Sequence, residues 1–284
     1  MYLSSACVKH EYIKDSVNEL AQNGFKDIEL SGGTKYYLGY EDDLLRLKEK
    51  YHLNYLVHNY FPPPPQDFIL NLASLDDDVY HKSLEHCHRA IALSQKLGAS
   101  KFCVHAGFFI NIKTSEIGKN LSASELFNKD KAMGRFCEGY TEIKKAARGI
   151  DIYIENNVLS LSNMKTFQNQ NPLMLTDYQG YLELKSLIEF KLLLDVAHLN
   201  VSANSLGIDY AEQLNNMLAL SDYVHVSDND GLHDQSQCFQ ENSKILNILK
   251  KQDLRGKTMT METYGSLENI KQSQALLERT LRLN

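Results

Sequence analysis

Short apolar runs alternate with longer segments of helical hydrophobic spacing along the whole chain. The apolar runs predict strands over 2–8, 26–31, 54–60, 101–107, 150–156, 190–197, 221–227 and 257–263. The segments between them predict helices over 11–23, 40–51, 78–97, 122–148, 178–188, 207–220, 243–252 and 266–283. Strands that alternate with helices favour parallel pairing through right-handed crossovers.

Repetition of this unit predicts an α/β fold, a single (β/α)8 barrel of the TIM type that spans residues 1–284. An open doubly wound sheet usually has fewer strands and a glycine-rich first turn, and the chain has no GxGxxG sequence. The loops after the third, fourth, fifth and seventh predicted strands are long, whereas those that lead from helices into strands are short. In a barrel, long loops of this kind lie at the C-terminal face of the strands, where active sites are built.

Acidic and imidazole side chains stand at the ends of six consecutive predicted strands. In strand order they are His58, His105, Glu155, Asp195 with His198 three residues further on, His225 and Glu262. A single histidine or glutamate at a strand end is usually a hydrogen-bonded or solvated residue. Closure of a barrel would direct all six strand ends toward one axis, which makes an independent structural role for each of them a poor explanation.

A divalent metal explains this group. Burying several carboxylates together without a cation is costly, and no Lys or Arg lies within three residues after Glu155, His225 or Glu262. Two Glu, one Asp and one His form a mixed oxygen and nitrogen set, which suits Mn²⁺ or Zn²⁺. The pattern therefore predicts a metal held by Glu155, Asp195, His225 and Glu262.

Charge and composition narrow the classes of function. A formal net charge of −6 without a basic run argues against a nucleic-acid partner. The chain has no apolar stretch long enough to span a membrane and no signal-peptide pattern at its start. Five scattered cysteines without a CxxC pair favour reduced thiols, so a cytoplasmic location is expected. The sequence is compatible with a homo-oligomer.

Four motifs carry a resemblance to a known family: "IENN", "LDVAHLN", "VHVSDND" and "METYG", in this order and spacing. The chain resembles the xylose isomerase-like TIM barrel superfamily, which contains sugar isomerases and epimerases and also endonuclease IV-like enzymes. The similarity covers essentially the whole chain. Resemblance to the ketose 3-epimerase branch implies one metal on the four residues named above, and it implies that His198 binds substrate oxygens.

Resemblance to the endonuclease IV branch implies further ligands. His58 and His105 match histidines that bind an additional metal there, and a D-x-H sequence after the seventh strand holds a third zinc. In "HDQSQ", Asp234 fits this pattern, but Ser236 stands where the histidine would be and His233 lies on the other side. We therefore expect His58, His105 and Asp234 to bind substrate or a second metal. The chain also departs from the epimerase pattern. Many epimerases carry an arginine shortly after the strand-seven histidine, and none closely follows His225 here.

Three functions remain in contention. The expected one is a metal-dependent isomerase or epimerase of a sugar or sugar phosphate, in which Glu155, Glu262 and His198 are catalytic and a proton moves through a metal-stabilised enediolate. The alternative is an endonuclease IV-like phosphodiesterase acting on DNA, which the acidic charge and the incomplete D-x-H sequence disfavour. A barrel that binds a ligand without turnover would leave the paired glutamates unexplained. The expected partner is a small sugar.

Overall fold

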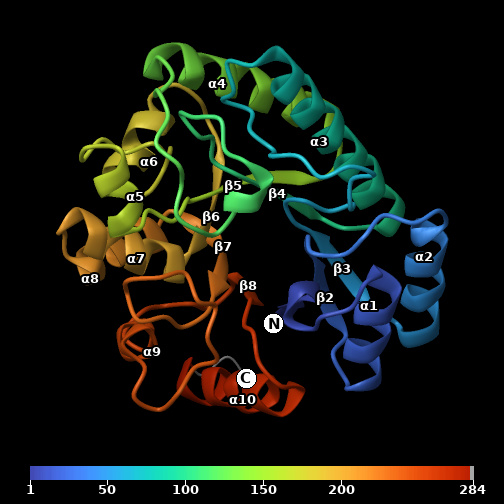
Figure 1. Cartoon of the computed structure of the whole chain (residues 1–284). Coiled ribbons are helices and arrows are strands. Elements are labelled where there is room, and N and C mark those ends of the chain that lie inside the picture. The colour runs from blue at the N-terminus through green and yellow to red at the C-terminus, as the bar shows by residue number, and fades with distance from the viewer. Residues whose placement is uncertain (282–284) are drawn as a thin grey trace.

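In the computed structural model, which describes residues 1–281, eight parallel strands close into a barrel surrounded by helices (Figure 1). Each strand pairs with the next, and the last pairs with the first. The strands are β1 (Tyr2–Ser4), β2 (Asp27–Leu30), β3 (Asn54–Val57), β4 (Lys101–His105), β5 (Asp151–Glu155), β6 (Lys191–Asp195), β7 (Ser221–Val226) and β8 (Thr258–Met261). The predicted barrel is confirmed.

Helices follow the strands and cover the outside of the barrel (Figure 1). They are α1 (Ile13–Gln22), α2 (Tyr40–Tyr51), α3 (Asp77–Leu97), α4 (Lys129–Ala146), α5 (Leu161–Thr166), α6 (Tyr178–Lys185), α7 (Val196–Leu206), α8 (Tyr210–Leu218), α9 (Lys244–Leu249) and α10 (Leu267–Leu281). The helix predicted over 40–51 coincides with α2, whereas the one predicted over 122–148 begins only at Lys129. Neither α5 nor α7 was predicted.

The strand predicted over 190–197 was too long, because α7 begins directly after Asp195. Oδ1 of Asp195 accepts hydrogen bonds from the backbone N–H groups of Ala197 and His198, which caps the new helix. A strand buried on both faces and a buried helix are both apolar without clear periodicity, so the boundary is hidden in the sequence. The early helix start holds His198 near the end of β6.

Alternation along the strands divides their side chains into two sets. Ile152 and Ile154 of β5 join the large core beneath the helices, whereas Tyr153 belongs to a separate cluster. This cluster, here called the apolar layer, consists of Leu56, Cys103, Tyr153, Leu193 and Tyr223. Two residues further along the same strands lies the polar layer, His58, His105, Glu155, Asp195 and His225. The apolar layer therefore forms the floor beneath the polar layer.

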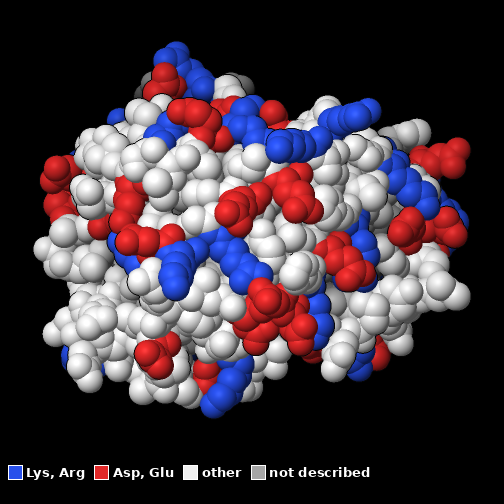
Figure 2. Space-filling view, turned by 90° about the horizontal axis from the view of Figure 1, so that it is seen from above, with Lys and Arg blue, Asp and Glu red and all other residues white. Residues whose placement is uncertain are grey.

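On the face shown in Figure 2, basic and acidic side chains are intermixed without an extended patch of one sign. Within residues 1–281, no helix combines the length and apolar character needed to cross a bilayer.

His86 of α3 is buried without a polar partner. Its side chain is fully buried, and neither ring nitrogen has a hydrogen-bond partner within residues 1–281. The ring lies edge-on against Phe68, with ring centroids 5.6 Å apart. Burial lowers the pKa of His86 to about 4, so the folded chain holds it neutral at pH 7.

We expect His86→Leu to make the protein less sensitive to acid. The ordinary pKa is 6.5 and the folded value about 4, so the unfolded chain takes up the proton first. The contribution of neutral His86 to the free energy of unfolding is therefore fully present above pH 6.5 and is lost as the pH falls toward 4. Urea unfolding across this range should show that the wild type loses up to about 1.4 kcal/mol per pH unit more than the variant. His81→Leu, at an exposed position of the same helix, should keep the wild-type slope, and equal slopes for all three proteins would contradict this account.

Candidate metal centre

The predicted strand-end residues meet at the C-terminal end of the barrel, around Glu155. His58 Nε2 lies 2.7 Å from Glu155 Oε2, and His105 Nε2 lies 3.3 Å from the same oxygen. His225 Nδ1 lies 3.4 Å from Glu155 Oε1 and 3.3 Å from Glu262 Oε2. Side chains that are far apart in the sequence therefore share one small volume.

The other predicted residues adjoin this group. Glu155, Asp195 and His225 offer ligand atoms that all lie within 4.8 Å of one another. His198 Nδ1 lies 3.7 Å from Glu155 Oε1, and its Nε2 lies 3.4 Å from Asp234 Oδ2. Asp234 thus reaches the group from the loop after β7. Every residue predicted for the site lies in or beside it.

Two overlapping groups within residues 1–281 have the spacing of metal ligands, one formed by Glu155, Asp195 and His225 and the other by His58, His105 and Glu155. Glu155 belongs to both. Glu262 adjoins the first group through its contact with His225. We call Glu155, Asp195, His225 and Glu262, the residues expected to hold an ion, the metal centre, and the second group offers a neighbouring position.

Unpartnered buried atoms test whether these residues fit a metal. Within residues 1–281, Glu155 Oε1 and both ring nitrogens of His225 are buried without an aligned hydrogen bond. Buried polar atoms normally have partners, because desolvation without one is costly. A divalent cation between Oε1 and Nδ1 would satisfy both, and carboxylate and imidazole are ligands that Zn²⁺ and Mn²⁺ accept. The donor set fits.

The ionisation of the group points the same way. Burial lowers the pKa of His225, but Glu29 and Glu155 outweigh burial and raise it well above its ordinary value. Burial favours a neutral Glu155, but His105, His58 and His225 hold its pKa well below the usual range. Burial raises the pKa of Asp195 to about 6. The carboxylates thus attract positive charge, which protons or a metal can supply.

The group is closed on one side and accessible on the other. Glu155 and His225 have no solvent exposure, whereas the side chains of His105, Glu262 and Asp234 keep 21%, 19% and 27% of theirs. A small molecule would therefore reach the metal centre past these three side chains.

Two asparagines directly after Glu155 connect neighbouring segments, a role that sequence reasoning missed. Asn156 donates from Nδ2 to the carbonyl of Asp195 at 3.0 Å, and its Oδ1 accepts from the Asp195 N–H at 2.8 Å. Asn157 donates to the carbonyl groups of Ala106, Gly107 and Met174. The signal in the sequence that could have indicated this role is the pair of asparagines directly after the strand-end glutamate.

The first two strands also contribute, which sequence reasoning missed as well. Ser4 Oγ of β1 lies 3.2 Å from Glu262 Oε1 and 2.9 Å from Ser31 Oγ. Glu29 of β2 is fully buried, and its Oε1 lies 2.9 Å from His225 Nε2. Polar residues from β1 and β2 therefore stand behind Glu262 and His225.

His233 does not complete a third group with His198 and Asp234. Its side chain is 69% exposed, and its Nδ1 lies 3.0 Å from Asp230 Oδ2. Ser236 occupies the other candidate position and has no imidazole to offer.

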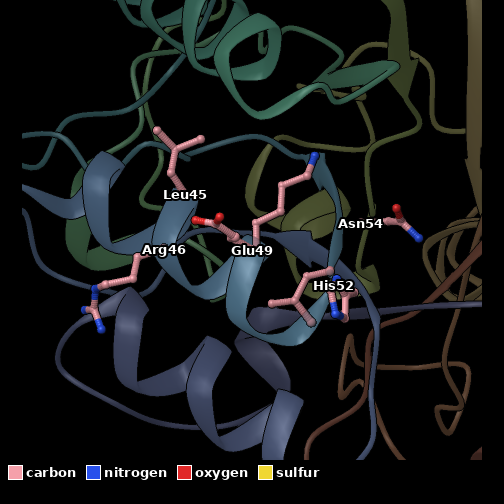
Figure 3. A pocket seen from close by; sticks show the side chains of 7 residues that line it. Leu45, Arg46, Glu49, His52 and Asn54 are labelled. Carbon is pink, nitrogen blue, oxygen red and sulfur yellow. The ribbon is translucent and has the colours of Figure 1, made fainter.

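A broad, open hollow of about 680 Å³ lies at the other end of the barrel, where α2 ends and β3 begins (Figure 3). Its lining residues are Leu45, Arg46, Lys48, Glu49, His52, Leu53 and Asn54. The side chains labelled in Figure 3 do not converge on a common point. Barrel active sites lie at the C-terminal ends of the strands, so we assign this hollow no part in the chemistry.

The closed parallel barrel and the carboxylate and imidazole group at its C-terminal end define a class of protein. A family model described as "Xylose isomerase-like TIM barrel" matches residues 17–280, and the chain belongs to this family. No curated protein matches the chain in sequence.

Solved structures share the fold across nearly the whole chain. A D-tagatose 3-epimerase-like protein superposes with a TM-score of 0.73 at 19% identity, covering 99% of this chain and 96% of that one. D-psicose 3-epimerase from Clostridium cellulolyticum gives 0.62 at 15% identity, with 99% and 95% covered. Endonuclease IV from Thermus thermophilus gives 0.61 at 14% identity, with 99% and 98% covered. Similarity at these identities shows the fold and does not choose among the activities.

We expect Asp195→Asn to weaken the binding of Zn²⁺ or Mn²⁺ by about 100-fold or more, because it removes a charged ligand. The amide oxygen can still accept the two backbone hydrogen bonds that cap α7. Isothermal titration calorimetry measures the affinity, and circular dichroism checks the fold. Asp209→Asn is the matched control, because Asp209 caps α8 by accepting from the Glu212 N–H at 2.7 Å. Unchanged affinity in Asp195→Asn would remove Asp195 from the metal centre.

Proposed function

We propose that the protein is a divalent-metal-dependent isomerase or epimerase of a sugar or sugar phosphate. One observation carries the proposal: carboxylates from β5 and from just beyond β8 approach the same nitrogen, His225 Nδ1, at 3.4 Å and 3.3 Å. Paired carboxylates around one point suit removal and return of a proton at one carbon. Sugar 3-epimerases among the structures that share the fold support this choice.

Glu155, Asp195, His225 and Glu262 would hold the ion. When bound, a divalent metal would polarise a substrate carbonyl and stabilise the negative charge that develops on its oxygen. His225 would present Nδ1 to it, because Nε2 faces Glu29.

Glu155 and Glu262 would transfer the proton. One carboxylate would take a proton from the carbon beside the carbonyl, and the C–H electron pair would move toward the carbonyl oxygen to give an enediolate. The other carboxylate would take up a proton from solvent and deliver it to the opposite face of the same carbon, and the first would release its proton to solvent, which restores both groups. Burial would raise the pKa of Glu262, but the neighbouring His225 lowers it to about 2, so this carboxylate is ionised at neutral pH. Glu155 is ionised as well.

His198 would bind substrate oxygens. Its Nδ1 lies 2.9 Å from the carbonyl oxygen of Asn156, which leaves Nε2 facing Asp234 and the accessible side. Burial lowers its pKa, but Asp195 and Asp234 raise it well above the ordinary value, so the ring carries a proton that Nε2 can donate. His58 and His105 would bind neighbouring hydroxyl groups.

A second candidate function is a metal-dependent phosphodiesterase acting on DNA, similar to endonuclease IV. The observation in its favour is the group of His58, His105 and Glu155, which could hold a second ion that shares Glu155 with the first. Against it stand the net charge of −6 and the missing third histidine beside Asp234.

Glu262→Gln should lower kcat by about 10²–10⁴-fold while much of the metal affinity remains, because the amide oxygen can bind a metal but cannot accept the proton. Incubation of a panel of ketoses with Mn²⁺ in D₂O, followed by NMR, reports both epimerisation and solvent exchange. The control is Glu268→Gln, at an exposed side chain on α10 that pairs with Gln272. Full turnover in Glu262→Gln would exclude Glu262 from proton transfer.

Counting metals separates the two candidate functions. If the protein is an isomerase, the wild type should bind one ion tightly. A double variant with His58→Asn and His105→Asn should then keep that ion while its KM rises. If the protein is a phosphodiesterase, the wild type should bind at least two ions and cleave abasic DNA, and the double variant should bind one ion fewer. Elemental analysis at saturating Zn²⁺ gives the count, and His88→Asn, a partly exposed position on α3, is the control. Two tightly bound ions together with DNA cleavage would overturn the isomerase proposal.

A further inference from the structure

Glu29 is a fully buried carboxylate that the proposed reaction does not use. Its Oε1 lies 2.9 Å from His225 Nε2. We propose that Glu29 is a positioning residue that holds the His225 ring so that Nδ1, with its lone pair free, faces the metal. This inference rests on the proposed metal-dependent function and adds to it a residue that approaches the metal centre from behind.

The position of Glu29 follows from alternation along β2. Ile28 and Leu30 belong to the core beneath the helices, so the residue between them points into the barrel. A carboxylate with no solvent exposure is costly there unless it is partnered. Thr260 donates from Oγ1 to Glu29 Oε2 at 2.9 Å, and Oε1 has the His225 ring as its ion-pair neighbour without an aligned hydrogen bond.

Thr260 determines which oxygen of Glu29 faces the imidazole. Thr260 pairs with His225 in the register of β7 and β8, so the two side chains lie side by side. Because Thr260 occupies Oε2, Oε1 is the oxygen left for His225. The side chains thus form a continuous row of contacts that runs from Thr260 through Glu29 to His225, and from His225 to Glu155 and Glu262.

Carboxylates face both ring nitrogens of His225, but Glu155 and Glu262 at Nδ1 belong to the proposed ligand set, whereas Glu29 at Nε2 does not. Tyr223 packs edge-on against His225 with centroids 5.5 Å apart, and the His58 ring is 4.9 Å away. These contacts restrict the plane of the ring but treat its two nitrogens alike. With the Nε2 proton directed at Glu29, Nδ1 is the nitrogen that would give up its proton to a metal, because a ligating imidazole is neutral. Glu29 Oε1 and His225 Nε2 lie within hydrogen-bond distance, although the bond is not aligned in this structure.

The test measures Co²⁺ binding to the full-length chain by calorimetry and by the visible spectrum of the bound ion. Glu29→Ala should weaken binding by about 10–100-fold, as loss of a carboxylate behind a ligating histidine typically does. Glu29→Gln should weaken Co²⁺ binding less, because its amide oxygen can still accept a hydrogen bond from the Nε2–H group. Both variants should alter the Co²⁺ spectrum, which a change in overall stability alone would not do.

Asp27→Asn is the matched control. Asp27 lies on the same strand, bonds to Asn54 at an exposed position, and loses the same charge in the substitution. Its Co²⁺ affinity and spectrum should equal those of the wild type. Thr260→Val, which leaves Glu29 in place and removes its other partner, should weaken binding by less than Glu29→Ala.

Each result has a definite meaning. If the wild type binds no divalent metal, the proposed function fails and this inference fails with it. If the wild type binds Co²⁺ and both Glu29 variants bind it with the same affinity and spectrum, the inference is wrong while the metal centre stands. Should Glu29→Ala fail to fold, the isosteric Glu29→Gln decides: an unchanged spectrum and affinity overturn the role of Glu29, and a changed spectrum in a folded chain supports it.

Discussion

Glu155 carries a negative charge with no contact with solvent, and the arrangement of the whole site depends on how that charge is balanced. Imidazoles of His58, His105 and His225 approach it within 3.4 Å, each from a different strand. The charge can therefore be balanced only when the barrel has closed in the correct register. A slip of one residue in β5 would replace Glu155 by Ile154 at the axis and turn the carboxylate into the apolar core outside. The polar site thus selects the register that the fold requires.

The same alternation explains how far the sequence predicts the site. Apolar runs followed by His, Glu or Asp identified the residues of β3 to β7 and the glutamate beyond β8, because these side chains come last on their strands. Glu29 was missed because Leu30 follows it, so β2 does not end in a polar residue. The signal was nevertheless present as a charged residue between two apolar ones on a buried strand. Ser4 gave no such signal, since a serine is common in many settings.

Other features could not be predicted, because they depend on contacts between distant segments. The start of α7 is decided by Asp195, which ends a strand and caps a helix at once, and both elements are apolar in sequence. The helix α5 has only six residues within a long polar loop, too short for periodicity to show. That His58 and His105 share one oxygen of Glu155, while His225 contacts the other, follows only from the closed barrel.

The two sides of the site have different consequences for function. On the closed side, Glu29, His225 and Asp195 belong to the proposed metal centre and its support, and the same ligand chemistry would serve an epimerase or a phosphodiesterase. On the accessible side, His105, Glu262 and Asp234 are partly exposed, and there one ion with a polyhydroxy substrate would differ from two ions with a phosphodiester. His105 and Glu155 are close enough for either outcome. Assignment of the activity therefore depends on what lies between His58 and His105, rather than on the four residues of the metal centre.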